Sequence, residues 1–156
     1  MLDPQAADTI ADVYGLGNDP VLSGPVARGE VGQVWRLTTS RGSWAVKEPF
    51  EPPPPAEVDD DAAFQDVVAA TGVSMPSVVR TQAGDVLVDV GSAAVRVYGW
   101  VDLLERDPWL DPATVGRIVA SIHRVRYHGE NPVDPWYTDP IGGERWDELI
   151  VRLTEA

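Results

Sequence analysis

The sequence predicts an α+β fold: an antiparallel β-sheet of about five strands with one helix, followed by further helices. Three observations support this prediction. Short β-prone segments separated by glycine turns fill most of residues 1–101, one helical segment interrupts them, and two amphipathic helical patterns lie after residue 102. We therefore expect two units, a sheet-based unit over residues 1–101 and a helical unit over residues 102–156.

The first expected element is a short helix over residues 8–14, in which Ile10, Val13 and Tyr14 form the apolar side. The segments expected as strands are residues 21–28, 33–38, 43–47, 85–90 and 94–98. Ser40-Arg41-Gly42 separates the second strand from the third, and this composition is typical of a tight turn.

The turn between the first two strands reads Gly29-Glu30-Val31-Gly32. Glycine has no Cβ, so we expect positive φ angles at Gly29 and Gly32 that bring backbone N–H groups close to a phosphate. Many glycine-containing hairpins bind nothing, so this turn indicates a phosphate site only in combination with a suitable cation on a neighbouring strand.

Side chains alternate along the third expected strand, so Ala45 and Lys47 share one face of the sheet. Trp44 and Val46 face the other side. The small Ala45 side chain, with Val34 of the second strand, suits a flat base lying against the sheet. The ammonium of Lys47 is then expected to reach phosphate oxygens as a point charge.

Four prolines at residues 52–55 precede a helix expected over residues 61–71. We interpret the prolines as a stiff loop, with a polyproline ligand for an aromatic groove as the alternative. The acidic triplet at residues 59–61 is expected to cap this helix. A metal site is the less favoured alternative, because adjacent Asp residues on a helix point in different directions. Phe64, Val67 and Val68 are expected to form the buried face.

A second long helix is expected after Asp111-Pro112, which reads as an N-cap followed by an N1 proline. Its core-facing stripe is predicted to be Val115, Ile118, Val119 and Ile122. A last amphipathic helix is expected over residues 144–153.

The order of these motifs resembles the aminoglycoside phosphotransferase family of small-molecule kinases. The glycine turn and the Ala45-Val46-Lys47 strand are similar to the glycine-rich loop and lysine strand of protein kinases. Gly72-Val73-Ser74-Met75-Pro76 resembles a family motif that leads into the next strands, and residues 98–103 stand at the interlobe hinge. The helix that carries His123 is similar to the one beyond that hinge. The resemblance implies a protein-kinase-like N-lobe followed by an incomplete C-lobe.

The resemblance also implies roles for single residues. The residues expected to contact the nucleotide are Gly29, Glu30, Val31, Gly32, Val34, Ala45, Lys47, Tyr98, Trp100 and Val101. The loop would cover the phosphates, the lysine would hold the α- and β-phosphates, and the hinge backbone would hydrogen-bond the base. A helix carboxylate pairs with the strand lysine in this family. Asp61 stands there in this chain, one methylene shorter than the usual Glu, and Glu57 is the alternative partner for Lys47.

A phosphotransferase of this family needs a histidine-x-aspartate catalytic loop and a later Asp that holds Mg²⁺. Neither motif is recognisable, so we assign no catalytic residue and no metal ligand. We expect the nucleotide-binding lobe of an ATP- or GTP-dependent phosphotransferase, with the Mg²⁺ ligands in a lobe that these 156 residues lack. A fragment, a split gene product and a naturally degenerate kinase all fit this pattern. The expected acceptor is a cationic or hydroxyl-bearing small molecule.

A non-catalytic, degenerate kinase-like module is the alternative function. It would bind a second polypeptide or self-associate through the apolar stripe of the last helix, Trp146, Leu149, Ile150 and Leu153. An unrelated β-rich domain with a coincidental hairpin is a third interpretation, and it predicts no effect of nucleotides.

The composition limits the other classes. Twelve Lys and Arg stand against 25 Asp and Glu, a net charge of −13, so we expect neither nucleic acid nor an anionic membrane as a partner. The same sign favours cationic ligands. The chain has no cysteine for disulfide or thiol chemistry. It shows no secretory signal and no apolar run of about 18 residues, so a cytoplasmic location is expected.

Overall fold

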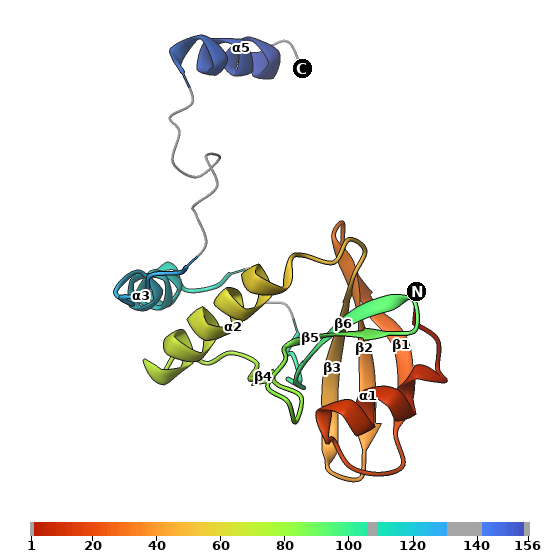
Figure 1. The fold of residues 1–156 in the computed structure, drawn as a ribbon. Coiled ribbons are helices and arrows are strands. Elements are labelled where there is room, and N and C mark those ends of the chain that lie inside the picture. The colour runs from red at the N-terminus through yellow and green to blue at the C-terminus, as the bar shows by residue number, and fades with distance from the viewer. Residues whose placement is uncertain (1, 106–108, 131–141, 155–156) are drawn as a thin grey trace.

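A computed structural model of the protein describes residues 2–105, 109–130 and 142–154. The helices are α1 (Ala6–Tyr14), α2 (Pro55–Ala70), α3 (Pro112–His123) and α5 (Gly143–Thr154). The strands are β1 (Val21–Arg28), β2 (Gly32–Thr39), β3 (Gly42–Pro49), β4 (Val78–Val79), β5 (Leu87–Val90) and β6 (Ala93–Gly99). Figure 1 shows the sheet with α1 and α2 beside it.

All strand pairs are antiparallel, and the strands form one six-stranded sheet in the order β1-β2-β3-β6-β4, with β5 also paired to β6. The predicted α+β fold with an antiparallel sheet is therefore confirmed. β1 begins and ends at the predicted residues, and the other four predicted strands shift by one or two residues at their ends. The short β4 was not predicted.

One face of the sheet packs against α1 and forms the main core. Ile10 and Tyr14 of α1 are buried against inward-facing strand residues, among them Leu37, Val46 and Val97. The Tyr14 hydroxyl donates to the carbonyl oxygens of Val86 and Val95 at 2.9 and 3.0 Å. Val46 faces this core, whereas Ala45 and Lys47 face the opposite side, as the alternation along the strand predicted.

The α1 face also contains a buried carboxylate, that of Glu48, which is only 4 % exposed. It accepts hydrogen bonds from the Leu2 backbone N–H at 2.9 Å, from Gln33 Nε2 at 2.8 Å and from Trp35 Nε1 at 2.9 Å. Burial disfavours its charge, but the hydrogen bonds from Gln33, Trp35 and Leu2 outweigh burial and lower the pKa of Glu48. Glu48 thereby joins the N-terminal segment to β2 and β3.

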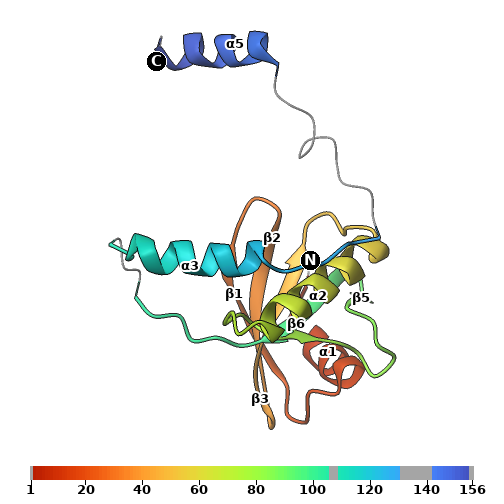
Figure 2. The same ribbon diagram turned by 90° about the vertical axis from the view of Figure 1, so that its left-hand side faces the viewer.

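α2 lies on the other side of the sheet from α1 (Figures 1 and 2). It begins at Pro55, six residues before the predicted start, so the acidic triplet lies inside the helix and does not cap it. The reason is that proline is well suited to the first helical position, where its missing N–H costs nothing. The predicted buried face is also partly wrong. Val68 is buried with Val58 and Ala62, but Phe64 and Val67 are 37 % and 38 % exposed.

α3 begins at Pro112, and the Asp111 carboxylate accepts hydrogen bonds from the N–H groups of Ala113 and Thr114, as predicted for an N-cap. Its apolar stripe, however, does not face a core in this structure, because Val115, Ile118 and Val119 are 42–48 % exposed. Beyond α3, the Tyr127 hydroxyl contacts Asp60 of α2.

α5 covers the last predicted helix. Its Trp146 and Ile150 side chains are exposed, and the side chains of Leu149 and Leu153 lie outside the described part of the structure. None of the helices within the described ranges has the length and apolar character needed to cross a membrane.

Candidate functional site

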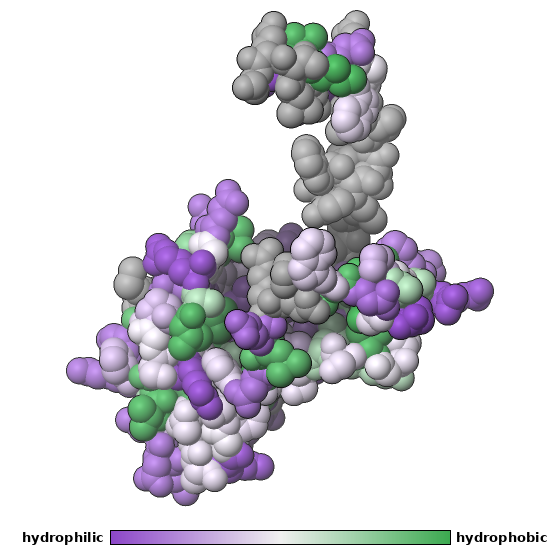
Figure 3. All heavy atoms as spheres, turned by 180° about the vertical axis from the view of Figure 1, so that it is seen from behind, coloured by the Kyte–Doolittle hydropathy of each residue, from purple (hydrophilic) through white to green (hydrophobic). Residues whose placement is uncertain are grey.

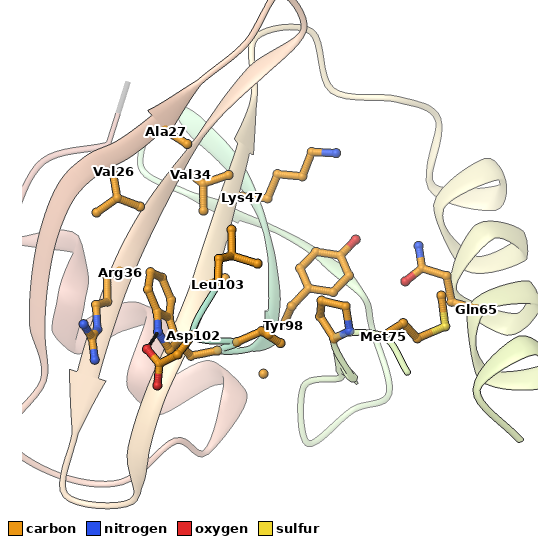
Figure 4. A pocket seen from close by; sticks show the side chains of 15 residues that line it. Val26, Ala27, Val34, Arg36, Lys47, Gln65, Met75, Tyr98, Asp102 and Leu103 are labelled. Atoms are coloured by element: carbon orange, nitrogen blue, oxygen red, sulfur yellow. Dashed lines mark hydrogen bonds between the residues drawn. The ribbon is translucent and has the colours of Figure 1, made fainter. Parts of the chain in front are cut away.

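A cavity of about 830 Å³ opens on the α2 side of the sheet, next to the segment that follows β6 (Figure 4). This volume is in the range of small-molecule sites. Its walls come from β1, β2, β3, α2, the residues before β4, and the end of β6. The lining residues are Val26, Ala27, Val34, Arg36, Ala45, Lys47, Gln65, Met75, Pro76, Tyr98, Gly99, Trp100, Val101, Asp102 and Leu103.

Six of the residues predicted from the sequence line this cavity together: Val34, Ala45, Lys47, Tyr98, Trp100 and Val101. Strand register explains why they meet. Val34 of β2 lies opposite Lys47 of β3, and Ala45 of β3 lies opposite Tyr98 of β6. Residues directly opposite on paired strands project from the same face, so these strands form one platform. The predicted residues Gly29, Glu30, Val31, Gly32 and Asp61 do not line the cavity.

Lys47 is the only lysine in the sequence, and it projects from β3 on the cavity side of the sheet (Figure 4). Among the described residues it forms no ion pair with Asp61 or with Glu57. The Asp61 carboxylate instead lies 3.6 Å from Nη1 of Arg96, the β6 residue directly opposite Lys47. The structure therefore separates the predicted Lys47–Asp61 pair.

The glycine turn differs from expectation in its backbone. Neither Gly29 nor Gly32 has a positive φ angle. At Gly32 the absence of a side chain matters for another reason, because a Cβ would lie 2.6 Å from the carbonyl oxygen of Glu48. The turn is closed by the Gly29 N–H, which donates to the Gly32 carbonyl at 2.9 Å. Within the described part of the chain, the N–H groups of Glu30 and Val31 donate to no other residue, so they remain available to a ligand.

The hinge segment after β6 offers fewer backbone donors than predicted. The Gly99 N–H donates to Ser77 at 2.9 Å and the Trp100 N–H donates to Ser43 at 3.3 Å. The N–H of Val101 makes no hydrogen bond to the described residues. It is therefore a backbone donor at the cavity that stays available to a ligand.

Three interacting side chains, those of Arg36, Trp100 and Asp102, form the edge of the cavity near the hinge. The Arg36 guanidinium lies over the Trp100 ring, 4.6 Å from its centroid. Trp100 Nε1 donates to the Asp102 carboxylate at 2.9 Å, as Figure 4 shows. Arg36 also donates to the Ser43 hydroxyl at 3.1 Å. These contacts hold the Trp100 ring across one end of the cavity.

Several lining residues were not predicted as site residues. Arg36 was identifiable, because it stands two residues from Val34 and so shares its face in a strand. Gln65 was not, because the register of α2 against the sheet has no local sequence signal. Val26 and Ala27 lie where the β1–β2 register shifts, between Ser23 and Ala27, and a bulge of this kind redirects side chains.

Tyr98 lines the cavity, and its side chain is partly buried. Burial raises the pKa of Tyr98, while Arg96 and a hydrogen bond from the Gln65 side chain oppose that rise. Over the residues that the structure describes, no cluster of three or more His, Asp or Glu side chains could hold a metal ion.

Comparison with known proteins adds three findings. A sequence model of the phosphotransferase enzyme family matches residues 24–131. A spectinomycin phosphotransferase, solved in complex with ADP and spectinomycin, superposes with a TM-score of 0.59 at 9 % identity over 82 % of this chain and 39 % of its own. A putative aminoglycoside phosphotransferase from Ralstonia eutropha JMP134 superposes with a TM-score of 0.52 at 16 % identity over 99 % of this chain and 47 % of its own.

A search among curated proteins found no match. The chain thus spans less than half the length of the two solved structures that it resembles. At these identities the likeness to the solved structures concerns the fold.

Proposed function

This chain belongs to the phosphotransferase enzyme family, and we propose that it acts as the nucleotide-binding lobe of an ATP- or GTP-dependent small-molecule phosphotransferase. The observation that carries the proposal is the cavity, where an apolar platform, a single lysine and a hinge donor converge. In this proposal residues 1–101 form the nucleotide lobe, and residues 102–156 lead into the acceptor side.

The cavity fits a nucleotide in size and chemistry. Val34 and Ala45 offer a flat apolar surface of the kind on which a purine base stacks, with Tyr98 beside them. The Val101 N–H would hydrogen-bond the base edge. Lys47 lies at the opposite side of this platform from the hinge, so its ammonium would meet phosphate oxygens as a point charge. The Glu30 and Val31 N–H groups would cover phosphates only if the loop moves toward the cavity, which it does not line here.

Mg²⁺ would accompany the nucleotide and neutralise phosphate charge, with its protein ligands outside this chain. The acceptor in this proposal is a hydroxyl-bearing, cationic small molecule. The spectinomycin phosphotransferase with a similar fold was solved in complex with ADP and spectinomycin, a nucleotide and a small molecule. The net charge of −13 of this chain favours a cationic acceptor by long-range attraction.

Calorimetric titration of the full chain with Mg-ATP and Mg-GTP tests the proposal, with Lys47→Ala as the variant. Loss of a charge-assisted contact is expected to weaken binding by on the order of 1–3 kcal/mol. Arg152→Ala is the matched control, because it removes one positive charge from an exposed position of α5 that does not line the cavity. Binding that Lys47→Ala leaves unchanged would remove Lys47 from the site, and a folded chain without any nucleotide binding would refute the nucleotide function.

A second candidate function is a non-catalytic module that binds another protein chain. The observation in its favour is the exposed apolar surface of the helical unit, where Val115, Ile118 and Val119 of α3 and Trp146 of α5 are all more than 40 % exposed. Figure 3 shows apolar side chains at the surface of α5. Light scattering coupled to size-exclusion chromatography would detect self-association, and Trp146→Ser should reverse it if α5 makes the contact.

A further inference from the structure

Arg96 is a buried cation on the cavity side of the sheet. It lies on β6 directly opposite Lys47 of β3, and its side chain is only 8 % exposed. Its Nε and Nη2 atoms have no hydrogen-bond partner among the described residues. Burying a guanidinium with unpaired donors is costly, so its partner must matter to the fold. Its charged partner is Asp61 of α2, whose Oδ2 lies 3.6 Å from Nη1 and whose side chain is 65 % exposed. The guanidinium also lies 5.8 Å from the centroid of the Tyr98 ring.

Gln65 lies one helical turn beyond Asp61 on α2, and Tyr98 lies two residues beyond Arg96 on β6. Four residues of helix rise about 6 Å and two residues of strand about 6.7 Å, so Gln65 and Tyr98 are in step with the Asp61–Arg96 ion pair. We call this ion pair the α2–β6 polar contact.

The apolar contact of α2 with the sheet side is small. Its buried cluster consists of Val58 and Ala62 with Val86, joined by the partly buried Val78 and Leu87. A helix held by so few apolar side chains depends strongly on its polar anchors for position. Gln65, one turn along α2 from the α2–β6 polar contact, and Tyr98, two residues from it on β6, both line the cavity. The placement of α2 therefore sets the shape of one cavity wall.

We propose that Arg96, and not Lys47, is the cation that positions α2 against the sheet, which leaves the Lys47 ammonium uncommitted beside the cavity. Arginine suits this buried task because its planar guanidinium is less strongly hydrated than an ammonium. Like charges directly opposite on paired strands repel, and Asp61 relieves that repulsion by neutralising Arg96. Arg96 is thus a positioning residue for the cavity, and its effect on nucleotide binding rests on the function proposed above.

Amide hydrogen exchange of α2 in the nucleotide-free full chain tests this assignment without requiring any ligand. Asp61→Asn is expected to speed exchange of the α2 amides about tenfold, because it removes the charged partner of Arg96. The same substitution is then made in two backgrounds. In Arg96→Met it should change α2 exchange less than about twofold, and in Lys47→Met it should keep its full effect.

The outcomes decide between the two cations. If the effect of Asp61→Asn disappears in Lys47→Met, or if Asp61→Asn leaves α2 exchange of the wild type unchanged, the assignment to Arg96 is overturned. Neither of these arms needs an Arg96 variant, so the test holds even if Arg96→Met does not fold. Asp61→Glu is the rescue variant, since it restores a carboxylate, and it should keep α2 exchange close to the wild-type rate.

Nucleotide titration of the same variants separates this inference from the proposed function. If both are right, Asp61→Asn weakens Mg-nucleotide binding several-fold, and its effect multiplies with that of Lys47→Met because the two act independently. If α2 exchange behaves as expected but no variant or wild type binds nucleotide, Arg96 still positions α2 and the nucleotide function fails. Binding that Asp61→Asn leaves intact, despite faster α2 exchange, would show that the cavity does not depend on α2.

Discussion

The two faces of the sheet differ in how completely a buried charged side chain is paired. On the α1 face, Glu48 is buried and accepts hydrogen bonds from Leu2, Gln33 and Trp35. On the α2 face, Arg96 is buried with two unpaired nitrogen atoms and one carboxylate at 3.6 Å, next to an open cavity. The buried charge on the α1 face is thus well hydrogen-bonded, whereas the buried charge on the α2 face, where we propose the ligand, is only partly paired.

The largest expected effect in this comparison is on the closed face. Glu48→Gln should destabilise the protein by about 2–3 kcal/mol at pH 7, because hydrogen bonds to a charged acceptor are lost and a new amide donor faces the Gln33 and Trp35 donors. Urea unfolding followed by circular dichroism measures this. Glu57→Gln, at an exposed position of α2, is the matched control and should stay within about 0.5 kcal/mol of the wild type.

The difference in stability between the wild type and Glu48→Gln should depend on pH in a defined direction. The pKa of Glu48 is lowered in the folded state, so its carboxylate stabilises the protein above the unfolded pKa of about 4.3. That stabilisation is lost as the pH falls through the folded pKa. The gap between the wild type and Glu48→Gln should therefore shrink on acidification below about pH 4.3. A gap that stays constant down to the acid transition would contradict an ionised Glu48.

Substitutions in the glycine turn should have an intermediate effect on the free energy of unfolding. Gly32 is buried in the sheet, whereas Gly29 is exposed at the edge of the turn. Gly32→Ala should cost about 1–3 kcal/mol, since its Cβ would meet the Glu48 carbonyl oxygen at 2.6 Å. Gly29→Ala should change stability by less than about 0.5 kcal/mol, because the nearest atom to its Cβ is 3.9 Å away. Thermal unfolding of both variants measures the difference, and equal losses would mean that both glycines serve the backbone conformation of the turn.

Local patterns predicted the parts of the site that depend on one strand at a time. Ala45 and Lys47 were placed together because side chains alternate along β3, and Val34 joined them because a tight turn fixes the β2–β3 register. The fold class followed from the same short strands and glycine turns. Strand alternation and tight turns depend on residues that are close together in the chain, so they can be recognised from the sequence alone.

The partner of Asp61 could not be predicted in this way. Asp61 was expected to pair with Lys47, but the residue that Asp61 meets is decided by the pairing of β3 with β6, which joins residues 49 positions apart in Lys47 and Arg96. No local pattern encodes that pairing. The start of α2 was missed for a different reason, because a run of four prolines was interpreted as loop although its last member begins the helix.

The smallest expected effect is that of Val119→Ala on α3, and the same substitution in the sheet core, Val95→Ala, is its comparison. Val95→Ala removes methyl groups from a fully buried position of β6 and should cost about 2 kcal/mol. Val119→Ala, on the 44 % exposed stripe of α3, should cost less than about 0.5 kcal/mol in the chain as it stands. Urea unfolding at several protein concentrations measures both. A loss at Val119 that approaches the loss at Val95 and grows with protein concentration would show that a second chain covers α3 in solution, which would favour the protein-binding module over an isolated lobe.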